Sequence, residues 1–140
     1  MTNLIKKFQK ILLVEIEDLH DDLDLFIQVV VDRHQNRQIT DYVYAENIAI
    51  LRNEVLGLED CIRGCADLDP GSIASADDLA EFLKVRFKKR LDAHGYVPAL
   101  YTLLAKRIEK IATYLRLEEA ARAADALEQK KHQSPVQFAG

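Results

Sequence analysis

The sequence predicts an all-α protein: a four-helix up-down bundle with a short third helix, long first and fourth helices, and a tendency to form oligomers. Two observations predict this fold class. Apolar residues recur at spacings of three and four along most of the chain, and no segment alternates apolar and polar residues as a half-buried strand would. The clearest stripe falls on one face of a single helix and consists of Tyr44, Ile48, Leu51, Val55, Leu58, Ile62 and Cys65.

Length and composition indicate one ordinary globular domain, which we place at residues 1–132, followed by a flexible C-terminal tail at residues 133–140. The apolar fraction of 49% and the charged fraction of 30% are unlike those of disordered chains. A net charge of −4 argues against general affinity for nucleic acid. Neither a membrane-spanning run nor a secretion signal is evident in the sequence, so we expect a cytoplasmic protein without a membrane partner.

The first helix is predicted from Asn3 to His34. Its wide apolar face carries Leu4, Ile5, Phe8, Leu12, Ile16, Leu19, Leu23, Phe26, Ile27 and Val30. A polar break at residues 35–38 lets the chain reverse. Thr40 is the expected N-cap of the second helix, which ends near Ala66.

The second break, residues 67–72, contains Pro70 and Gly71, through which a helix does not easily continue. Ser75 and Asp78 then resemble a capping box that begins a third helix over residues 76–94, with Gly95 as its C-terminal cap. Short breaks of this kind favour antiparallel neighbours.

Pro98 fits the first turn of the fourth helix, which is predicted to continue to about Lys130. Its core stripe consists of Val97, Leu100, Leu104, Ile108, Ile111 and Leu115. Beyond Leu115 the same face becomes charged, so the end of this helix is expected to leave the core. Its Ala-rich stretch is a place to look for a partner.

Several apolar residues lie outside the main stripes or at their margins. Because the third helix is about half as long as the first, a monomer would leave part of the longer helices uncovered. These residues therefore predict a second packing surface and self-association; they are Val29, Val31, Tyr42, Ile50, Leu56 and Leu117.

Glu17, His20 and Asp24 follow one side of the first helix and form a Glu-x-x-His pattern, which supplies metal ligands in di-iron bundles. A second copy of the pattern is missing from the sequence, so a solvated polar face is the competing interpretation. A metal site would need carboxylates from neighbouring helices, such as Glu54 or Glu118.

Cys61 and Cys65 are spaced four apart, unlike a redox C-x-x-C pair. This spacing predicts two buried small apolar side chains, with a redox pair or two soft metal ligands as alternatives.

A run of cations on the third helix consists of Lys84, Arg86, Lys88, Lys89 and Arg90. Arg86 and Arg90 flank the apolar face, whereas Lys84 and Lys88 lie on the opposite side. We expect these cations to pair with the acidic segment of the first helix, within one chain or between subunits. An anionic protein partner and nucleic acid are the alternatives.

The sequence carries no assembled constellation of reactive groups and gives no catalytic residue or required cofactor. We therefore expect a protein that acts through protein–protein contact, as an adaptor, scaffold or regulatory subunit, in the form of a homodimer. The cationic run, Leu117 and Arg122 are the expected contact residues. The first alternative is a bundle that binds a transition metal or cofactor through carboxylate and His ligands; the second is a nucleic-acid-binding protein that uses the third helix.

Overall fold

The computed structural model describes residues 2–66, 71 and 73–133, and within them the chain is all-α, without a strand. It contains four helices: α1 (Thr2–Gln35), α2 (Asp41–Ala66), α3 (Ala76–Ala93) and α4 (Pro98–Gln133). The predicted fold class is confirmed, including the short third helix and the long first and fourth helices. Most of the predicted turn at 67–72, and the predicted tail beyond Gln133, lie outside the described residues.

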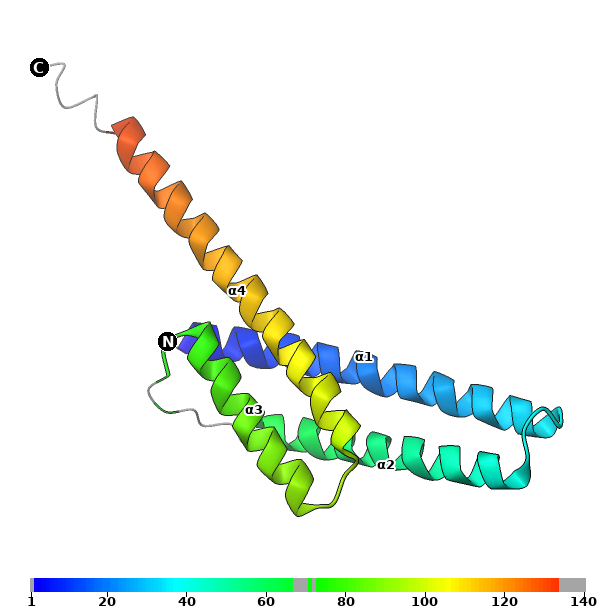
Figure 1. Cartoon of the computed structure of the whole chain (residues 1–140). Coiled ribbons are helices and arrows are strands. Elements are labelled where there is room, and N and C mark those ends of the chain that lie inside the picture. The colour runs from blue at the N-terminus through cyan, green and yellow to red at the C-terminus, as the bar shows by residue number, and fades with distance from the viewer. Residues whose placement is uncertain (1, 67–70, 72, 134–140) are drawn as a thin grey trace, which may run out of the picture.

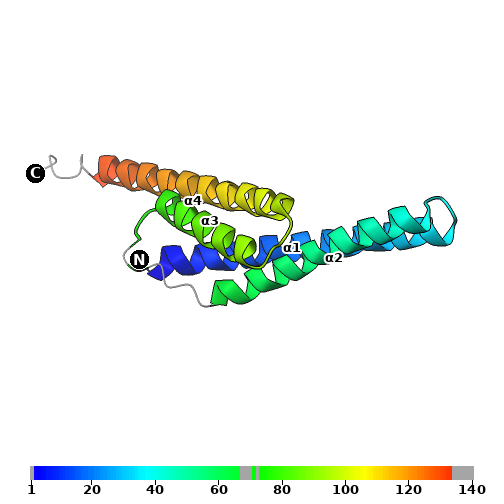
Figure 2. The same ribbon diagram turned by 60° about the horizontal axis from the view of Figure 1, so that its bottom comes forward.

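The helices form two antiparallel hairpins, α1 with α2 and α3 with α4 (Figure 1). The second hairpin lies on one side of the first and covers only part of its length (Figure 2). We call the covered part, residues 2–23 of α1 and 53–66 of α2, the proximal half. The remainder, residues 24–35 and 41–52, is the distal half and extends beyond α3 and α4 (Figure 1).

The other end of the molecule projects as well. From residue 116 to residue 131 every side chain of α4 is exposed except that of half-buried Glu118. This confirms the expectation that the end of the fourth helix leaves the core.

The predicted N-caps are confirmed by hydrogen bonds. The Val43 N–H donates to Thr40 Oγ1 at 3.2 Å, and the Asp78 N–H donates to Ser75 Oγ at 3.1 Å. Each bond satisfies a backbone donor that the first turn of a helix otherwise leaves unpaired.

α1 and α3 end in the same way, although only one of them ends at a glycine. After α3, Gly95 adopts φ +69°, and the Tyr96 N–H donates to the Leu91 carbonyl at 3.1 Å. After α1, Arg37 takes the same left-handed position with φ +58°, and the Gln38 N–H donates to the Arg33 carbonyl at 2.8 Å. Both ends are Schellman motifs, which satisfy carbonyls of the last helical turn.

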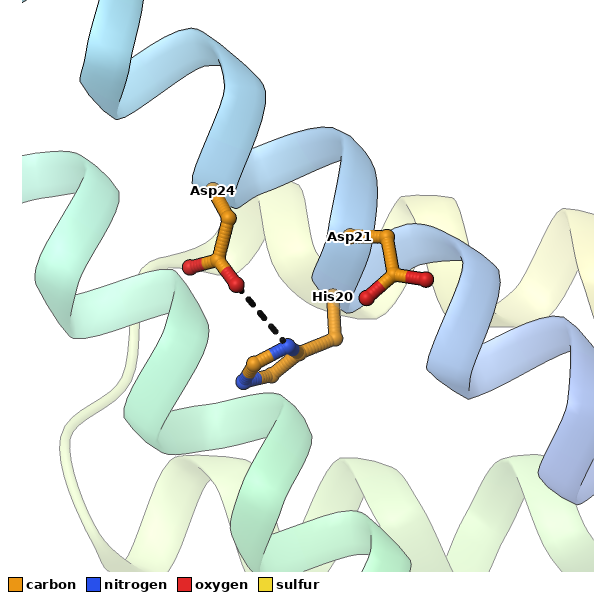
Figure 3. Close-up of side chains that lie close together, drawn as sticks. All are labelled: His20, Asp21 and Asp24. Atoms are coloured by element: carbon orange, nitrogen blue, oxygen red, sulfur yellow. Dashed lines mark ion pairs between the residues drawn. The ribbon is translucent and has the colours of Figure 1, made fainter.

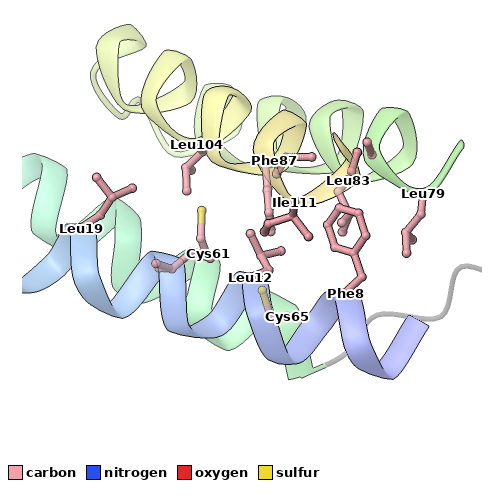
Figure 4. Close-up of a cluster of buried hydrophobic side chains, with 14 of the residues drawn as sticks. Phe8, Leu12, Leu19, Cys61, Cys65, Leu79, Leu83, Phe87, Leu104 and Ile111 are labelled. Atoms are coloured by element: carbon pink, nitrogen blue, oxygen red, sulfur yellow. The ribbon is translucent and has the colours of Figure 1, made fainter. Parts of the chain in front are cut away.

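The core lies where the two hairpins cross and contains side chains from all four helices (Figure 4). The predicted α2 stripe is buried or half-buried along its whole length, and the α4 stripe is buried from Leu100 to Leu115. Phe26 is an exception on α1, because its side chain is 58% exposed. It lies seven residues after Leu19, on the same face, but beyond the part of α1 that α3 and α4 cover.

α3 and α4 are seated on a face of α2 that is lined by small and polar residues. A Cβ atom at Gly57 would overlap the side chain of Leu100, and one at Gly64 would lie 3.2 Å from Arg90 Nη1. The Val97 N–H, just before α4, donates to Asn53 Oδ1 at 3.0 Å. The two glycines therefore allow the second hairpin to approach the α2 backbone closely, and Asn53 fixes where α4 begins.

Asp60 lies between these glycines and is the one buried charged residue in the described part of the chain. Arg90 on α3 donates two hydrogen bonds to it, from Nε to Oδ2 at 3.0 Å and from Nη2 to Oδ1 at 2.9 Å. These bonds lower the pKa of the Asp60 carboxyl below its usual range. The pair is bidentate, so it fixes the orientation of α3 as well as its position.

Removing Arg90 is expected to cost more stability than neutralising Asp60. The Asp60 side chain is only 9% exposed, whereas that of Arg90 is 32% exposed and can regain water. Arg90→Met should therefore lower the free energy of unfolding by about 2–3 kcal/mol, and Asp60→Asn by about 1–2 kcal/mol, in urea denaturation. The exposed neighbour Lys89→Met is the control, with a change within about 0.5 kcal/mol.

The same pair predicts a pH dependence with a definite sign. Because folding lowers the Asp60 pKa, its contribution to stability is present above the unfolded pKa of about 4 and disappears as the pH falls through the lowered value. Wild-type stability should therefore fall more steeply below pH 4 than that of Asp60→Asn. Parallel pH curves for the two proteins would contradict the assigned role of the pair.

Candidate functional site

The cations of α3 are largely engaged within the chain, but their partners differ from those predicted. Lys84 pairs with Glu81 and with Glu109 of α4. Lys88 lies 3.7 Å from Asp92 and 5.1 Å from the centre of the Tyr101 ring on α4. Arg90 binds Asp60 of α2. Among the described residues, none of these cations pairs with the acidic segment of α1, because the paired cations face α2 or α4.

The cations of α3 are distributed over several sides of the helix. Lys84 and Lys88 face α4, whereas Arg90 faces α2. Arg86 and Lys89 have no ion-pair partner within the described residues, and together with Glu81, Phe82 and Val85 they line a shallow groove on the outer side of α3. This groove presents two cations, one carboxylate and an apolar floor.

Glu15 shows where an acidic residue of α1 does find its partner. It lies 2.6 Å from Arg107 and 3.7 Å from Lys110, both on α4. Within the described residues, the ion pairs between α1 and the second hairpin are therefore made with α4.

His20 is the centre of a cluster of titratable groups on α1. One ligand atom each from His20, Asp21 and Asp24 lie within 4.8 Å of one another (Figure 3). His20 Nδ1 is 3.5 Å from Asp24 Oδ2, and Nε2 is 3.2 Å from Glu59 Oε1 on α2. A ring nitrogen and carboxylate oxygens are suitable ligands for a divalent transition metal.

The predicted metal ligands are only partly brought together. His20 and Asp24 belong to the cluster, whereas Glu17 does not, and Asp21 takes its place. Of the carboxylates expected from neighbouring helices, Glu118 instead pairs with Lys7 and with Arg122. Three groups from one helix leave most of a coordination sphere unfilled. Glu59 of α2 lies within hydrogen-bonding distance of His20 Nε2 and so joins α2 to α1.

Glu54 was the other carboxylate expected from a neighbouring helix. It is half-buried on α2, and burial raises the pKa of its carboxyl. It does not belong to the His20 cluster.

Apolar side chains are exposed on both helices of the distal half. Phe26 and Val29 on α1 are 58% and 44% exposed, and Val43 and Ile50 on α2 are 38% and 42% exposed. We call these four residues the open face. All of them belong to the distal half.

The open face continues the surface on which the second hairpin is seated. Val43 and Ile50 precede Gly57 and Gly64 at intervals of seven residues, so they lie on the face of α2 that meets α3 and α4. Phe26 follows Leu12 and Leu19 at the same interval on α1. The sequence predicted that Val29 and Ile50 belong to a second packing surface, but it placed Phe26 in the core. It does not show where the covering helices end.

The other residues predicted to form a second packing surface are distributed over the molecule. Tyr42, Leu56 and Leu117 are exposed, and Val31 is half-buried. Leu117 lies on the projecting part of α4, where Arg122 pairs with Glu118 at 2.7 Å. Within the described residues, no helix has an apolar stretch long enough to cross a bilayer.

Cys61 and Cys65 are free thiols, and their predicted burial is confirmed. Burial raises the pKa of Cys61 to about 12 and that of Cys65 to about 11. The thiolate, which is the reactive and metal-binding form, is therefore scarce at neutral pH.

Both cysteines should consequently resist a thiol reagent in the native protein. At pH 8 we expect the reaction with 5,5′-dithiobis(2-nitrobenzoate) to be at least about 100-fold slower than for the same chain unfolded in urea, because the native thiolate fraction is about 0.1% or less. The absorbance at 412 nm measures both rates. Rapid reaction of both thiols in the folded protein would instead support a redox or metal-binding pair.

No protein-family model, curated protein or solved structure matches the chain. Its function must therefore be inferred from its own contacts, charges and exposed surfaces.

Proposed function

We propose that this chain is a non-catalytic protein-interaction module, which acts as an adaptor, scaffold or regulatory subunit by packing the open face against another polypeptide. The observation that carries the proposal is the continuity of one helical face. Its proximal half is covered by α3 and α4, and its distal half carries Phe26, Val29, Val43 and Ile50 exposed in the same register.

Single exposed apolar side chains are normal on a protein surface. The open face is different because its four residues belong to two helices that pack against each other, beyond the part that α3 and α4 cover. Burying apolar area contributes about 25 cal/mol per Å², so covering this face would stabilise a complex. A helical partner fits best, since the adjoining part of the same face is already covered by helices.

The open face is supported by an ordered framework. Ile48 of α2 is buried. Near the turn that joins α1 to α2, His34 stacks on Tyr44 with ring centroids 4.0 Å apart. His34 Nε2 also lies 2.7 Å from Asp41 Oδ1. These contacts join the two helices independently of any partner, so little ordering would be required for binding.

The projecting part of α4 offers a second contact surface for the same function. Leu117 and Leu127 are 66% and 61% exposed, and Ala120 and Ala124 lie between them at helical spacing. The small side chains would allow another helix to approach closely. Arg86 and Lys89 of α3 would suit an acidic segment of a partner.

The two alternative functions have less support. For metal binding, the cluster at His20 supplies ligands from one helix only. For nucleic acid, three of the five cations of α3 are engaged in ion pairs within the chain, and Glu81 lies beside the other two. A cytoplasmic location stays a prediction.

Site-specific photo-crosslinking in the native cells tests the proposed function. The photoreactive residue p-benzoylphenylalanine placed at Phe26 or Ile50 should give a discrete covalent adduct to a protein chain, because the open face is expected to be in contact with one. Leu56, which is 54% exposed, serves as the matched control and should give no such adduct. Immunoblots after irradiation measure the result.

Absence of adducts at positions 26 and 50 would contradict the proposal, as would equal labelling at position 56. The size of a discrete adduct, followed by mass spectrometry, identifies the chain that lies against the open face.

A further inference from the structure

We infer that the outer side of α3 is a second docking site, which takes an acidic amphipathic helix from a partner protein. The site is the shallow groove lined by Glu81, Phe82, Val85, Arg86 and Lys89, and we call it the α3 groove. It is separate from the open face, which belongs to the distal half of α1 and α2. The inference therefore goes beyond the proposed function and does not depend on how the open face is covered.

The α3 groove lies on the side of α3 that faces away from α4. Lys84 and Lys88 contact residues of α4. Phe82, Val85 and Lys89 lie on the opposite side, because each residue of a helix is rotated by about 100° from the one before it. In Figure 1, α4 lies along one side of α3. All of the lining residues belong to α3 and extend over about two turns, so a partner segment would lie along this helix.

The floor of the α3 groove is apolar and only partly covered. Val85 is 52% exposed, whereas Phe82 is half-buried and packs against the core. These two residues are three positions apart and are therefore neighbours on the helix surface. An apolar side chain of a partner can bury Val85 against this fixed floor.

The charges of the α3 groove leave an excess of two cations. Glu81 is the one carboxylate that lines it, and Lys84 already donates a hydrogen bond to Glu81 Oε1 at 2.9 Å. The cations of α3 outside the groove are engaged in ion pairs within the chain. Arg86 and Lys89 have no such partner among the described residues. Carboxylates of a partner would supply the missing charge.

Arg86 is the more restricted of these two cations, because it is half-buried whereas Lys89 is exposed. Burial raises the pKa of Cys65, and the nearby charges of Arg86 and Arg90 act in the opposite direction. Arg86 therefore lies close to the end of α2, at the edge of the groove. A half-buried guanidinium is less screened by water than an exposed one, so it interacts more strongly with an anionic partner.

A helix suits this groove better than an extended peptide. The described part of the chain contains no strand, so an extended peptide would find no sheet edge for its backbone donors and acceptors. A helix satisfies these groups internally and presents side chains at spacings of three and four. The same spacings separate Lys89 from Arg86 and from Val85. Leucines and glutamates on one face of a partner helix can therefore meet the apolar floor and the two cations together.

An acidic protein segment is favoured over nucleic acid as the occupant. Nucleic-acid sites commonly neutralise several phosphates, whereas this groove offers two cations beside Glu81. The net charge of −4 also opposes general binding of a polyanion. Phosphates would use the cations but would leave Val85 exposed to water.

Fluorescence anisotropy with a synthetic helix tests the inference. The probe is a fluorescein-labelled peptide of about 20 residues, with leucine along one stripe, glutamate beside the stripe and alanine elsewhere. The purified chain should bind it with a dissociation constant below about 0.5 mM at low salt, and more weakly as salt rises. Arg86→Glu/Lys89→Glu should weaken binding at least about tenfold. Val85→Gln should weaken it at least about threefold, because the apolar contact is lost.

Two matched controls accompany these variants. Lys106→Glu/Lys130→Glu changes the net charge by the same amount at two exposed cations of α4, and it should leave the affinity within about twofold. Leu56→Gln replaces an apolar residue of α2 that is 54% exposed, and it should have no effect on binding. Far-ultraviolet circular dichroism checks that each variant is folded.

Failure of the acidic peptide to bind the wild-type chain would overturn the inference. So would equal losses of affinity in the two charge-reversed double variants, or an affinity unchanged by Val85→Gln. Binding of a labelled DNA strand through Arg86 and Lys89, without binding of the peptide, would also overturn it and assign the groove to nucleic acid. The proposed function is tested separately by adducts at positions 26 and 50, so either one can fail while the other stands.

Discussion

The packing of the second hairpin across both α1 and α2 is the constraint on which the rest of the structure depends. Gly57 and Gly64 leave room for Leu100 and Arg90, and Asp60 between them receives two hydrogen bonds from Arg90. Larger side chains at the glycines would hold the second hairpin away from α2. The buried carboxylate then selects one orientation, because Asp60 without Arg90 would keep only longer contacts, with Arg63 at 3.5 Å and His94 at 3.9 Å.

The length of α3 decides how much of the first hairpin α3 and α4 can cover. α3 has 18 residues, whereas α1 has 34, so the second hairpin reverses at Gly95 and reaches α2 only as far as Asn53. Beyond that level the same faces of α1 and α2 continue, with Phe26 and Ile50 exposed. The molecule therefore has a complete core at one end and a two-helix layer with one uncovered side at the other. A second chain on the distal half would complete the layer that α3 and α4 provide over the proximal half.

Much of this fold could be predicted from the sequence, because the signals are local. The hydroxyls of Thr40 and Ser75 and the glycine at position 95 define helix ends through interactions within a few residues. Contacts between distant residues were harder to predict. The acidic run on α1 and the basic run on α3 suggested a direct pairing, but Arg90 binds Asp60 and Glu15 binds Arg107. Linear charge patterns identify which groups need partners and do not give the order of helices in space.

The candidate sites likewise include some features that local sequence signals predict and others that depend on contacts between helices. Burial of Cys61 and Cys65 followed from their spacing of four along a helix, and the assignment of Val29 and Ile50 to a second packing surface followed from the helix lengths. Asp21 and Glu59 beside His20 could not be predicted, because their positions depend on how α1 and α2 are rotated against each other. Phe26 was placed in the core because its sequence spacing is the same as that of Leu19; only the position of α4 distinguishes them.

Hydrogen–deuterium exchange with and without the polypeptide that crosslinks at positions 26 and 50 tests most directly whether the distal half is stabilised by a second chain. Amides of residues 24–34 and 43–52 should exchange several-fold more slowly when that polypeptide is bound, whereas those of the proximal half should be unaffected. Exchange rates that the bound polypeptide leaves unchanged along the whole of α1 and α2 would contradict the account.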